Sequence, residues 1–502
     1  MRLGEVFEGC EVKNYNAEIE ICGVTSDSRK VKPGYLFICL AGTRHDGHDY
    51  VEEAVRRGAV CILGEHSTKS PIGTSITPCT RSAESKIWYN FTGRPTDKMK
   101  RIAVTGTSGK SSVVFLLRHL FRSAGLKVGV ITTLGAYSED RMISLGENGG
   151  SSVTDLAGAM TTPDPEFFFG AACEMAKDGC DMFIYEASSQ AIALGKLSAI
   201  SPNMAVFTNL SREHLDFHQT MEEYFNAKSG LMRGAHAAVI NCDDEWIGRL
   251  YGQYPNIPII RCTAQSEKIS DSDVCAIRIG HTNDGSEYVY FSEKAVFRVK
   301  TPQIGRFSVY NTMEAAACAI YFGCDAMMVK DALASFGGVR GRMYRVYEGD
   351  GLPCVIIDYA HTPNALKAVL GAVREWKKDG RLIVMFGCGG DRDRGKRPLM
   401  AKAAQELADL VVITSDNPRT EDPMAIISDI VCGMDGSKPY IVIPDRREAI
   451  CYVIEEACAE DTVILAGKGH EDYEITSDGK HPFDEEKCAR EALREKIMKN
   501  KN

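Results

Sequence analysis

A short glycine-rich segment constrains the fold of this chain more than any other feature of its sequence. It reads Thr105-Gly106-Thr107-Ser108-Gly109-Lys110-Ser111 and lies between an apolar run, residues 102–105, and an apolar helical stretch, residues 113–122. Glycines allow a strand to turn directly into a helix, so that successive backbone N–H groups face a phosphate group. The positive end of the helix, the Lys110 ammonium and the Ser111 hydroxyl then suit a nucleotide and its magnesium ion.

This segment predicts a parallel α/β domain that binds ATP or GTP. The general phosphate-loop pattern has a further glycine at position 104, where this chain has Val104. A tight connection that binds nothing is the weaker alternative, because Gly-Lys-Ser follows an apolar strand. The nucleotide contacts that we expect from the loop are Gly106, Thr107, Ser108, Gly109, Lys110, Ser111 and Ser112.

Apolar runs alternate with helical stretches along the rest of the chain, which predicts mostly parallel sheets covered by helices. A chain of 502 residues exceeds the size of one core, and we expect three α/β domains: residues 1–97, 98–337 and 338–502. The central domain is predicted to be a P-loop ATPase-like parallel sheet, and the last a doubly wound α/β domain. The expected strands include residues 35–40, 59–63, 127–131, 182–185, 204–207, 355–358, 382–386, 410–413 and 462–465.

Composition narrows the class of protein. The net charge of −9 argues against general nucleic-acid binding, which needs a basic face. No apolar run reaches the roughly 18 residues of a membrane span, and the N-terminus lacks the pattern of an export signal. We therefore expect a cytoplasmic protein without membrane insertion. The 18 cysteines form no Cys-x-x-Cys pair, so we expect structural thiols rather than metal ligands or disulfides.

One loop, residues 391–397, is locally cationic in this acidic chain. Concentrated positive charge can focus a small anionic ligand. The alternative is an ordinary solvated loop, which composition by itself leaves open.

Two potential metal ligands follow apolar strands of the central domain. Glu186 comes directly after residues 182–185, and His214 lies beyond residues 204–207. Side chains at the carboxyl ends of parallel strands lie at one edge of the sheet. A carboxylate and an imidazole there suit a divalent ion shared with ATP oxygens. A histidine in such a position is often only a surface residue, but the phosphate loop in the same domain favours the metal hypothesis.

Read in order, the motifs resemble those of the Mur ligase family, and within it the ligases that add the third residue of the peptidoglycan peptide stem. The resemblance covers nearly the whole chain. The matching segments are Asp27-Ser28-Arg29, Asp46-Gly47, the phosphate loop, Thr161-Thr162-Pro163, Glu186-Ala187-Ser188-Ser189, residues 209–216, Lys228, Asn311, Gly341-Arg342 and residues 358–363.

The resemblance implies a three-domain Mur ligase architecture with successive domains for a UDP-linked precursor, for ATP and for an amino acid. It implies an ATP-dependent amide ligase that adds meso-diaminopimelate to UDP-N-acetylmuramoyl-L-alanyl-D-glutamate through an acyl phosphate. The expected cofactors are ATP and Mg²⁺, the expected partners are these small molecules, and we expect a monomer.

The resemblance also assigns roles to individual residues. Lys110, Glu186, His214 and Lys228 are the implied catalytic residues, and Lys228, otherwise an ordinary helix lysine, is implied to be carbamylated. Ser111, Glu186, His214 and Lys228 are the implied metal ligands. ATP contacts beyond the loop are Asn311, Arg342, Asp358 and His361. Precursor contacts are Ser28, Thr43, Thr161, Thr162, Ser188 and Lys196.

The motif Asp416-Asn417-Pro418-Arg419 bears on the choice of amino acid. Asn-Pro predicts a turn that aims Arg419 away from the sheet, and arginine can grip a carboxylate with two hydrogen bonds. The resemblance implies that Arg419 binds the distal carboxylate of diaminopimelate and that Glu471 faces its distal amine. The full set of expected amino-acid contacts is Arg392, Asp416, Asn417, Arg419, Gly467 and Glu471.

Several positions depart from the usual family pattern, among them Gln190, Lys196, Tyr344 and Asn364. A diverged Mur-type ligase that adds L-lysine or another amino acid is therefore one alternative. A folylpolyglutamate- or cyanophycin-type ligase is a second. A nucleotide-binding regulator that has lost catalysis is a third, and the presence of Lys110, Glu186 and His214 argues against it.

Overall fold

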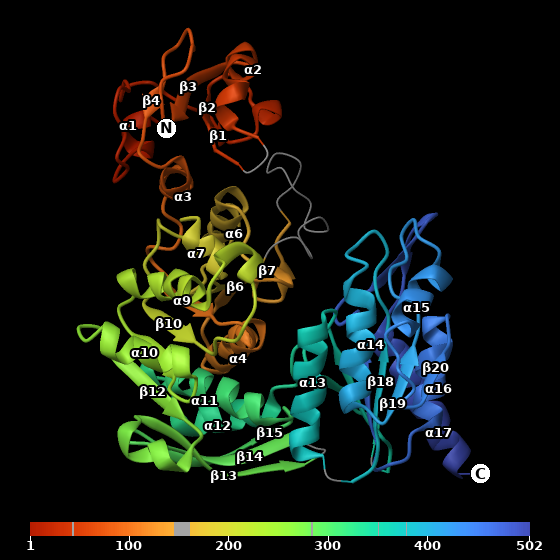
Figure 1. The fold of residues 1–502 in the computed structure, drawn as a ribbon. Coiled ribbons are helices and arrows are strands. Elements are labelled where there is room, and N and C mark those ends of the chain that lie inside the picture. The colour runs from red at the N-terminus through yellow and green to blue at the C-terminus, as the bar shows by residue number, and fades with distance from the viewer. Residues whose placement is uncertain (43–44, 145–160, 283–284, 350, 378, 502) are drawn as a thin grey trace. The chain divides into compact units, whose positions relative to one another are not determined.

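The computed structural model describes residues 1–42, 45–144, 161–282, 285–349, 351–377 and 379–501 (Figure 1). Contacts divide the chain into two compact units. The first comprises Met1–Ala276, Tyr290–Val296 and Tyr310–Ala332, and the second comprises Ile277–Val289, Phe297–Val309 and Leu333–Asn502. The domain boundaries predicted after residues 97 and 337 stay predictions.

A small parallel sheet forms the start of the first unit. Its strands pair in the order β1-β2-β3-β4, each with its neighbour in parallel. Phe37, Cys39 and Ile62 of this sheet pack against Val51 and Ala54 of helix α2. The elements are β1 (Gly23–Thr25), β2 (Tyr35–Ile38), β3 (Ala59–Gly64), β4 (Ser75–Ile76), α1 (Leu3–Val6), α2 (Val51–Arg56), α3 (Thr80–Phe91) and the 3-10 helices η1 (Ser28–Lys30) and η2 (Gly47–Tyr50).

A larger sheet has the hydrogen-bonded order β15-β14-β13-β12-β11-β10-β5-β9-β6-β7-β8. Neighbouring strands run parallel from β12 to β6, and β7 and β8 continue the sheet antiparallel. The strands are β5 (Lys100–Thr105), β6 (Val128–Thr132), β7 (Gly135–Ser138), β8 (Arg141–Met142), β9 (Met182–Glu186), β10 (Met204–Phe207), β11 (Ala238–Asn241), β12 (Ile259–Thr263), β13 (Val274–Thr282), β14 (Gly285–Ser292) and β15 (Val296–Thr301).

Helix α4 (Lys110–Ser123) follows β5 and packs on β6 and β9. Its apolar residues Val113, Leu117 and Leu120 are fully buried, as expected for a helix that covers a parallel sheet. The other helices between β8 and β16 are α6 (Pro165–Lys177), α7 (Ser189–Ala193), α8 (Leu215–His218), α9 (Met221–Ser229), η3 (Gly230–Gly234), α10 (Glu245–Gln253), η4 (Ser266–Asp271), α11 (Arg306–Tyr321) and α12 (Ala326–Ser335).

The second unit contains a six-stranded sheet of order β16-β17-β21-β18-β19-β20. All pairings are parallel except that of β16 with β17. One apolar core lies under α13–α15 and another under α16 and α17, so helices cover both faces (Figure 1). The elements are β16 (Tyr344–Val346), β17 (Cys354–Asp358), α13 (Pro363–Trp376), β18 (Leu382–Phe386), α14 (Lys396–Leu407), β19 (Leu410–Ile413), α15 (Pro423–Val431), β20 (Tyr440–Val442), α16 (Arg446–Glu456), β21 (Thr462–Ala466), β22 (Tyr473–Thr476), β23 (Gly479–Pro482) and α17 (Glu485–Lys501).

The predicted α/β class with parallel sheets is confirmed. Strands β10, β18 and β19 have the predicted bounds, whereas α4 begins three residues before its predicted start at Val113, because the helix starts within the phosphate loop. In both large sheets, the polar residues singled out from the sequence follow the carboxyl ends of adjacent strands. These strands are β10, β5, β9 in the first unit and β17, β21, β18, β19 in the second.

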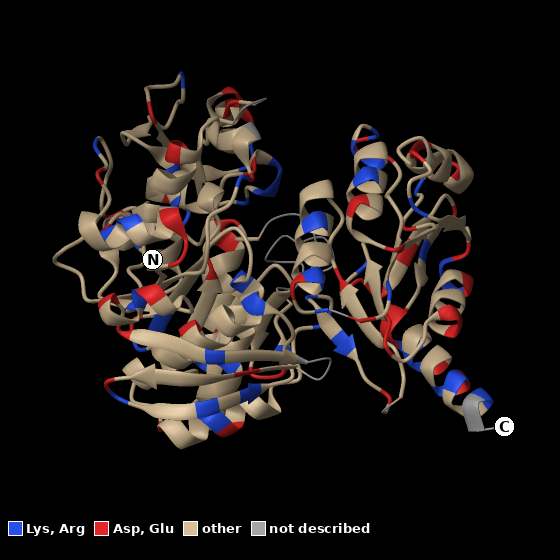
Figure 2. Cartoon of the chain, turned by 60° about the horizontal axis from the view of Figure 1, so that its bottom comes forward, with Lys and Arg blue, Asp and Glu red and all other residues tan. Residues whose placement is uncertain are grey.

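Among the described residues, no helix has both the length and the apolar composition that crossing a bilayer requires. In the view of Figure 2, acidic and basic residues are interspersed, and neither sign forms a continuous face. All 18 cysteines are free thiols.

The carboxyl group of Glu314 is buried without a hydrogen-bond partner among the described residues. Glu314 of α11 is 0% exposed, and neither of its carboxyl oxygens has a hydrogen-bond partner among the described residues. Burial, with the charge of Asp244, raises the pKa of Glu314 well above its ordinary value. At a pH above the pKa that Glu314 has in the unfolded chain, the unfolded state releases the carboxyl proton while the folded state retains it. The free energy of unfolding therefore falls as the pH rises.

We expect Glu314→Met, which keeps a similar volume, to raise the free energy of unfolding by about 1–3 kcal/mol at pH 7.5, the cost of an unpartnered buried polar group. The gain should be smaller at pH 5, because both states then hold more of the proton. Denaturant unfolding at several pH values measures the difference, with the exposed Glu293→Met as control. A gain that does not grow with pH would contradict the explanation.

Candidate active site

The phosphate loop needs its glycines for packing as well as for turning. Gly109 caps α4 in the left-handed conformation, with φ of 86°. A Cβ atom at Gly106 would lie 2.0 Å from Thr208 Oγ1, and one at Gly109 would lie 2.7 Å from Asn311 Oδ1. Neighbouring side chains therefore approach the loop backbone so closely that any larger residue would displace them. The predicted residue Asn311 is thus placed against the loop.

The segment after β10 holds the loop in shape. Thr107 N donates to Asn209 O and Ser108 N donates to Asn209 Oδ1, both at 2.9 Å. Asn209 Nδ2 donates in return to Ser108 O at 3.0 Å, and Thr208 Oγ1 donates to the same carbonyl at 2.7 Å. Ser112 lies in the first turn of α4. Because these bonds join adjacent strand ends, the loop is preformed.

Lys110 folds back over its own loop. Its ammonium donates to Gly106 O at 2.9 Å and to Thr107 O at 2.8 Å. The cation therefore lies beside the N-terminus of α4, where the backbone also favours negative charge. This is the arrangement expected of a phosphate-binding loop.

The structure brings two of the predicted metal ligands into direct contact. Ser111 Oγ donates to Glu186 Oε1 at 2.7 Å, and Glu186 is fully buried at the end of β9. Thr133, at the end of the neighbouring strand β6, donates to both Glu186 oxygens, from its N–H at 3.1 Å and from its Oγ1 at 3.0 Å. Three hydrogen bonds therefore hold the buried Glu186 side chain in a fixed orientation.

Lys228 is buried, unlike an ordinary helix lysine. It is 1% exposed, and its ammonium donates to Gly106 O at 2.8 Å and lies 4.8 Å from the centre of the Tyr224 ring. Burial, together with the Lys110 charge, holds the pKa of Lys228 well below its ordinary value. The amine therefore lies under the phosphate loop and is easily made neutral.

His214 occupies a strained position at the start of α8. Its φ of 58° lies in the left-handed region, which non-glycine residues adopt at a cost of about 1–3 kcal/mol. Its side chain is 44% exposed, its Nε2 atom lies 3.9 Å from Glu213 Oε2, and its ring meets the Tyr224 ring edge-on. The His214 side chain is part of the pocket lining.

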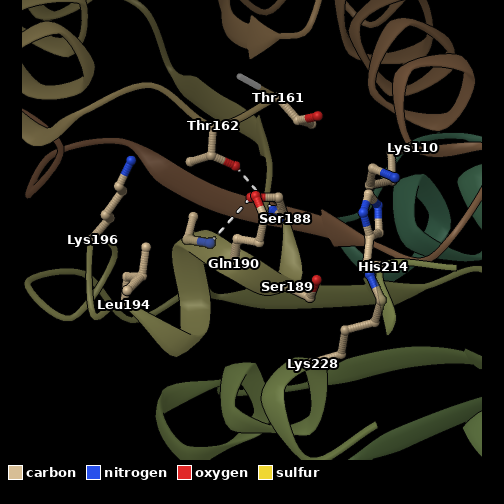
Figure 3. Close-up of a pocket in the computed structure, with 11 residues that line it drawn as sticks. Lys110, Thr161, Thr162, Ser188, Ser189, Gln190, Leu194, Lys196, His214 and Lys228 are labelled. Atoms are coloured by element: carbon tan, nitrogen blue, oxygen red, sulfur yellow. Dashed lines mark hydrogen bonds between the residues drawn. The ribbon is translucent and has the colours of Figure 1, made fainter. Parts of the chain in front are cut away.

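A pocket joins these residues to the predicted precursor contacts. In Figure 3, Lys110, His214 and Lys228 lie at one end and Lys196 lies at the other, with Ser188 between them. The lining consists of Lys110, Thr161, Thr162, Ser188, Ser189, Gln190, Ala191, Leu194, Lys196, His214 and Lys228. Lys196 Nζ forms an ion pair with Asp164 Oδ1 at 2.7 Å. The pocket therefore presents cations at both ends.

Two predicted precursor contacts are not part of this lining. Ser28 is buried in η1 and its Oγ donates to Glu53 Oε2 at 2.9 Å. Thr43 lies outside the described residues. Ser28 is therefore held in place by local packing beside the first sheet.

The donor set fits a hard divalent cation. A serine hydroxyl and a carboxylate are in contact, and an imidazole lies on the same pocket as the phosphate-loop lysine. A separate group of three possible ligands, Asp46, His48 and His66, was not predicted. Both ring nitrogens of His48 are occupied there, by Asp46 Oδ1 at 2.6 Å and by Glu65 N at 3.0 Å, which is typical of a structural histidine.

The second unit holds a further predicted group at the end of β17. Asp358 accepts from Met343 N at 2.7 Å and from Ala360 N at 2.8 Å, and burial raises the pKa of its carboxyl. The Arg342 guanidinium lies 5.3 Å from the centre of the Tyr359 ring. His361 is exposed, and its Nδ1 lies 2.9 Å from Tyr359 O. Asp358 thus fixes the turn that carries Arg342.

The predicted amino-acid contacts come together at the ends of β18, β19 and β21. Asn417 Nδ2 donates to Glu471 Oε2 at 2.8 Å, and Arg419 Nη1 donates to Gly390 O at 2.9 Å. Arg419 has φ of 52°, and its N–H donates to Ile475 O. A Cβ at Gly389 would lie 2.8 Å from Arg419 Nη1 and 3.8 Å from Arg392 Cγ. Asp416 is buried, and Gly467 follows β21 with φ of 112°.

Most of the charge of the basic loop is neutralised within the protein. Arg397 is fully buried and pairs with Glu421 and Asp429, each at 2.9 Å, while Arg394 also pairs with Glu421. Lys396 donates to His361 O. The predicted cationic loop is therefore only partly neutralised: Arg394 and Arg397 pair with carboxylates, whereas Arg392 is exposed.

Several residues of the site were not predicted. Tyr224 receives the Lys228 amine on its ring and its hydroxyl lies 3.1 Å from Thr107 Oγ1, and His218 Nε2 lies 2.9 Å from Ser189 Oγ. No spacing in the sequence joins these residues to the phosphate loop. Asn209 lies within the recognised segment 209–216, and Lys468 directly follows the predicted contact Gly467, so a polar residue close to a strand end was a signal that could have found both.

Three family models match the chain in order. The Mur ligase family, catalytic domain, matches residues 20–88, the Mur ligase middle domain matches residues 104–319, and the Mur ligase, glutamate ligase domain, matches residues 341–469. The matches include the phosphate loop, Glu186, His214 and Lys228 in the middle domain, and residues 416–419 in the last.

Relatives match along the full length. A UDP-N-acetylmuramoyl-L-alanyl-D-glutamate–2,6-diaminopimelate ligase of Syntrophomonas wolfei subsp. wolfei is 39% identical, over 99% of this chain and 100% of the relative. One of the same name from Geobacillus thermodenitrificans is 38% identical, over 95% and 96%. A solved structure of a ligase with this name has 30% identity and a TM-score of 0.72, with 99% of each chain covered.

The Thr162 hydroxyl ties the pocket to β9, which allows a test of the pocket geometry. Thr162 Oγ1 donates to Glu186 O and accepts from Ser188 N, both at 2.9 Å. We expect Thr162→Val to lower the free energy of unfolding by about 1–2 kcal/mol, because both backbone groups lose their partner. Denaturant unfolding measures this, with Thr161→Val as control. Equal effects of the two substitutions would contradict the geometry.

Proposed function

The chain belongs to the Mur ligase family, and on that premise we propose that it joins meso-diaminopimelate to UDP-N-acetylmuramoyl-L-alanyl-D-glutamate, with hydrolysis of ATP, in peptidoglycan synthesis. The observation that carries this proposal is the hydrogen bond from Asn417 to Glu471, which brings that carboxylate to the turn that carries Arg419, in a chain whose full-length relatives bear that ligase name. Because ATP is a substrate, we place the reaction in the cytoplasm.

The reaction consists of two transfers. A carboxylate oxygen of the nucleotide-linked dipeptide attacks the γ-phosphorus of ATP, and the bond to the bridging oxygen breaks to release ADP. The amine of diaminopimelate then attacks the acyl phosphate. The tetrahedral species collapses with loss of inorganic phosphate, and the nitrogen gives up a proton as the amide forms.

The phosphate loop is proposed to stabilise the charge that moves during the first transfer. The α4 N-terminus and the Lys110 ammonium provide fixed positive charge, which requires no reorganisation when the phosphoryl group moves. Asn311, Arg342, Asp358 and His361 are further residues proposed to contact ATP. The close approach of Asn311 to Gly109 and the turn held by Asp358 support these roles.

Ser111, Glu186, His214 and carbamylated Lys228 are proposed to hold Mg²⁺. The bound ion would neutralise phosphate oxygens during transfer. The contact between Ser111 and Glu186 supports this assignment, because a hydroxyl and a buried carboxylate are ligands that Mg²⁺ accepts.

Lys228 is proposed to carry a carbamate. A neutral amine attacks the carbon of CO₂ and releases a proton, which leaves an anionic carbamate on Nζ. Burial lowers the pKa of Lys228, so the neutral amine needed for this step is accessible, and the neighbouring Lys110 cation favours an anion in its place.

The pocket beside the loop is proposed to hold the acceptor end of the precursor. Thr161, Thr162, Ser188 and Lys196 supply hydroxyls and a cation that suit the anionic dipeptide, and they line the same pocket as Lys110. Ser28 and Thr43 are proposed to contact the uridine part.

Turnover with two amino acids tests the proposed reaction. We expect ADP release with UDP-N-acetylmuramoyl-L-alanyl-D-glutamate and meso-diaminopimelate, and little with L-lysine, which has no distal carboxylate for Arg419. Arg419→Ala should lower kcat/KM for diaminopimelate about 10–100-fold, the value of a hydrogen bond to a charged group. The exposed Arg447→Ala is the matched control. Equal turnover of lysine would overturn the assigned specificity.

Labelled bicarbonate tests the modification. After exchange with ¹³C-bicarbonate, we expect one carbamate signal in the ¹³C NMR spectrum of the protein, absent in Lys228→Ala and retained in the exposed control Lys98→Ala. Lys228→Ala should also lower kcat by about 10–100-fold, as loss of a metal-site group commonly does. Short carboxylic acids should restore part of the activity. A signal that persists in Lys228→Ala would refute the assignment.

A further inference from the structure

We propose that Lys468 is a positioning residue for amino-acid selection, because it fixes the amide of Asn417 and through it keeps Glu471 ready to accept the distal ammonium of the substrate. This inference rests on the proposed function and deepens it. Lys468 follows β21, one residue beyond the predicted contact Gly467, and was not itself among the predicted contacts.

Lys468 is a fully buried cation beneath the candidate amino-acid site. It is 0% exposed, and its ammonium donates to Asn417 Oδ1 at 3.1 Å and to Tyr473 O at 2.7 Å. Asp416 Oδ1 lies 3.5 Å away and supplies the counter-charge. Two hydrogen-bond acceptors and one counter-charge thus surround the ammonium. A buried charge with such partners is not a solvated surface group, and its position is determined by them.

These contacts decide which way the Asn417 amide points. Its Oδ1 accepts from Lys468 Nζ and from Ile475 N at 2.9 Å. With two donors on the oxygen, the NH₂ group must face the other way, and it donates to Glu471 Oε2 at 2.8 Å. Glu471 is therefore held as an acceptor, the form that an incoming ammonium requires.

The charges around Glu471 come from four parts of the second unit. Asp416 and Arg419 lie after β19, Lys468 after β21, Tyr473 on β22 and Tyr359 after β17. Burial and the Asp416 charge raise the pKa of Glu471, while the Asn417 hydrogen bond, Lys468 and Arg419 lower it. Loss of Lys468 would remove a positive charge and one of the two donors that orient Asn417, and both changes favour protonated Glu471.

Strand β22 of the β22–β23 hairpin contacts both Lys468 and Asn417 and also Arg419, the residue proposed to bind the distal carboxylate. Tyr473 O receives Lys468, Ile475 N holds Asn417, and Ile475 O receives the N–H of Arg419. The same strand thus supports Glu471 through Asn417 and keeps Arg419 in its left-handed conformation. One hydrogen-bond network through β22 therefore positions both Glu471, for the distal ammonium, and Arg419, for the distal carboxylate.

The test uses the full-length protein and compares Lys468→Met with wild type. Steady-state kinetics are measured from pH 6.5 to 9.5 with meso-diaminopimelate and with 2-aminopimelate, which lacks the distal amine. We expect Lys468→Met to raise KM for diaminopimelate about tenfold or more at pH 7, with partial recovery as the pH rises and Glu471 ionises. KM for ATP and KM for 2-aminopimelate should change less than about twofold. Lys480→Met, an exposed lysine on β23 beside Tyr473, is the matched control.

Asn417→Asp provides a second variant that keeps the size of the side chain. It removes the N–H donor to Glu471 and adds a negative charge, so it should shift the same pH profile in the same direction. If Lys468→Met does not fold, the pH profile of Asn417→Asp tests whether the orientation of the Asn417 amide controls Glu471. In the double variant Lys468→Met/Glu471→Gln, KM for diaminopimelate should equal that of Glu471→Gln alone.

An equal loss with both amino acids and no shift of the pH profile would show a merely structural role and overturn the inference. Unchanged kinetics in Lys468→Met would also overturn it. Absence of wild-type turnover with diaminopimelate would overturn the proposed function itself, and the inference with it, and is seen before any variant is made.

Discussion

The parallel register of β10, β5, β9 and β6 is the constraint on which the rest of the first unit depends. Because these strands run in the same direction, the loop after β5, Glu186 at the end of β9, Thr133 after β6 and the segment after β10 meet at one edge. The hydrogen bond from Ser111 to Glu186 joins two of these strand ends. A shift of β9 by one residue against its neighbours would turn the Glu186 side chain to the other face of the sheet.

In the second unit, too, polar groups gather at the carboxyl ends of neighbouring strands, but these groups suit a different kind of ligand. Asp358, the Gly467 turn, the Gly389–Gly390 turn and Arg419 follow β17, β21, β18 and β19, which are neighbours in the sheet. The network there is built from hydrogen bonds among Asn417, Lys468, Glu471 and the β22 strand. One unit thus concentrates groups for phosphate, and the other concentrates paired charges that suit an amino acid with charged ends.

Buried charges fall into two classes in this protein. Arg397 and Arg446 are each neutralised by nearby carboxylates, Glu421 and Glu485, and support the fold of the second unit. Lys228 and Glu314 have no such opposite charge in hydrogen-bonding contact among the described residues, so burial shifts the pKa of each in the direction that favours its neutral form. Lys228 lies against the phosphate loop, where a neutral amine is chemically useful, whereas Glu314 lies in α11 and only reduces stability.

The sequence by itself determined the α/β class, most strands of the parallel sheets and the phosphate loop, because these depend on local patterns of apolar residues and glycine. It also placed Glu186 at a sheet edge, because this residue directly follows a predicted buried strand, whereas the roles of Arg419 and Glu471 were implied by the resemblance. Only the tertiary structure decided that Lys228 is buried, that Glu421 neutralises Arg397, and that Lys468 lies beneath Glu471. These properties arise between residues far apart in the chain, and no local pattern records how burial and neighbouring charges change an ionisable group.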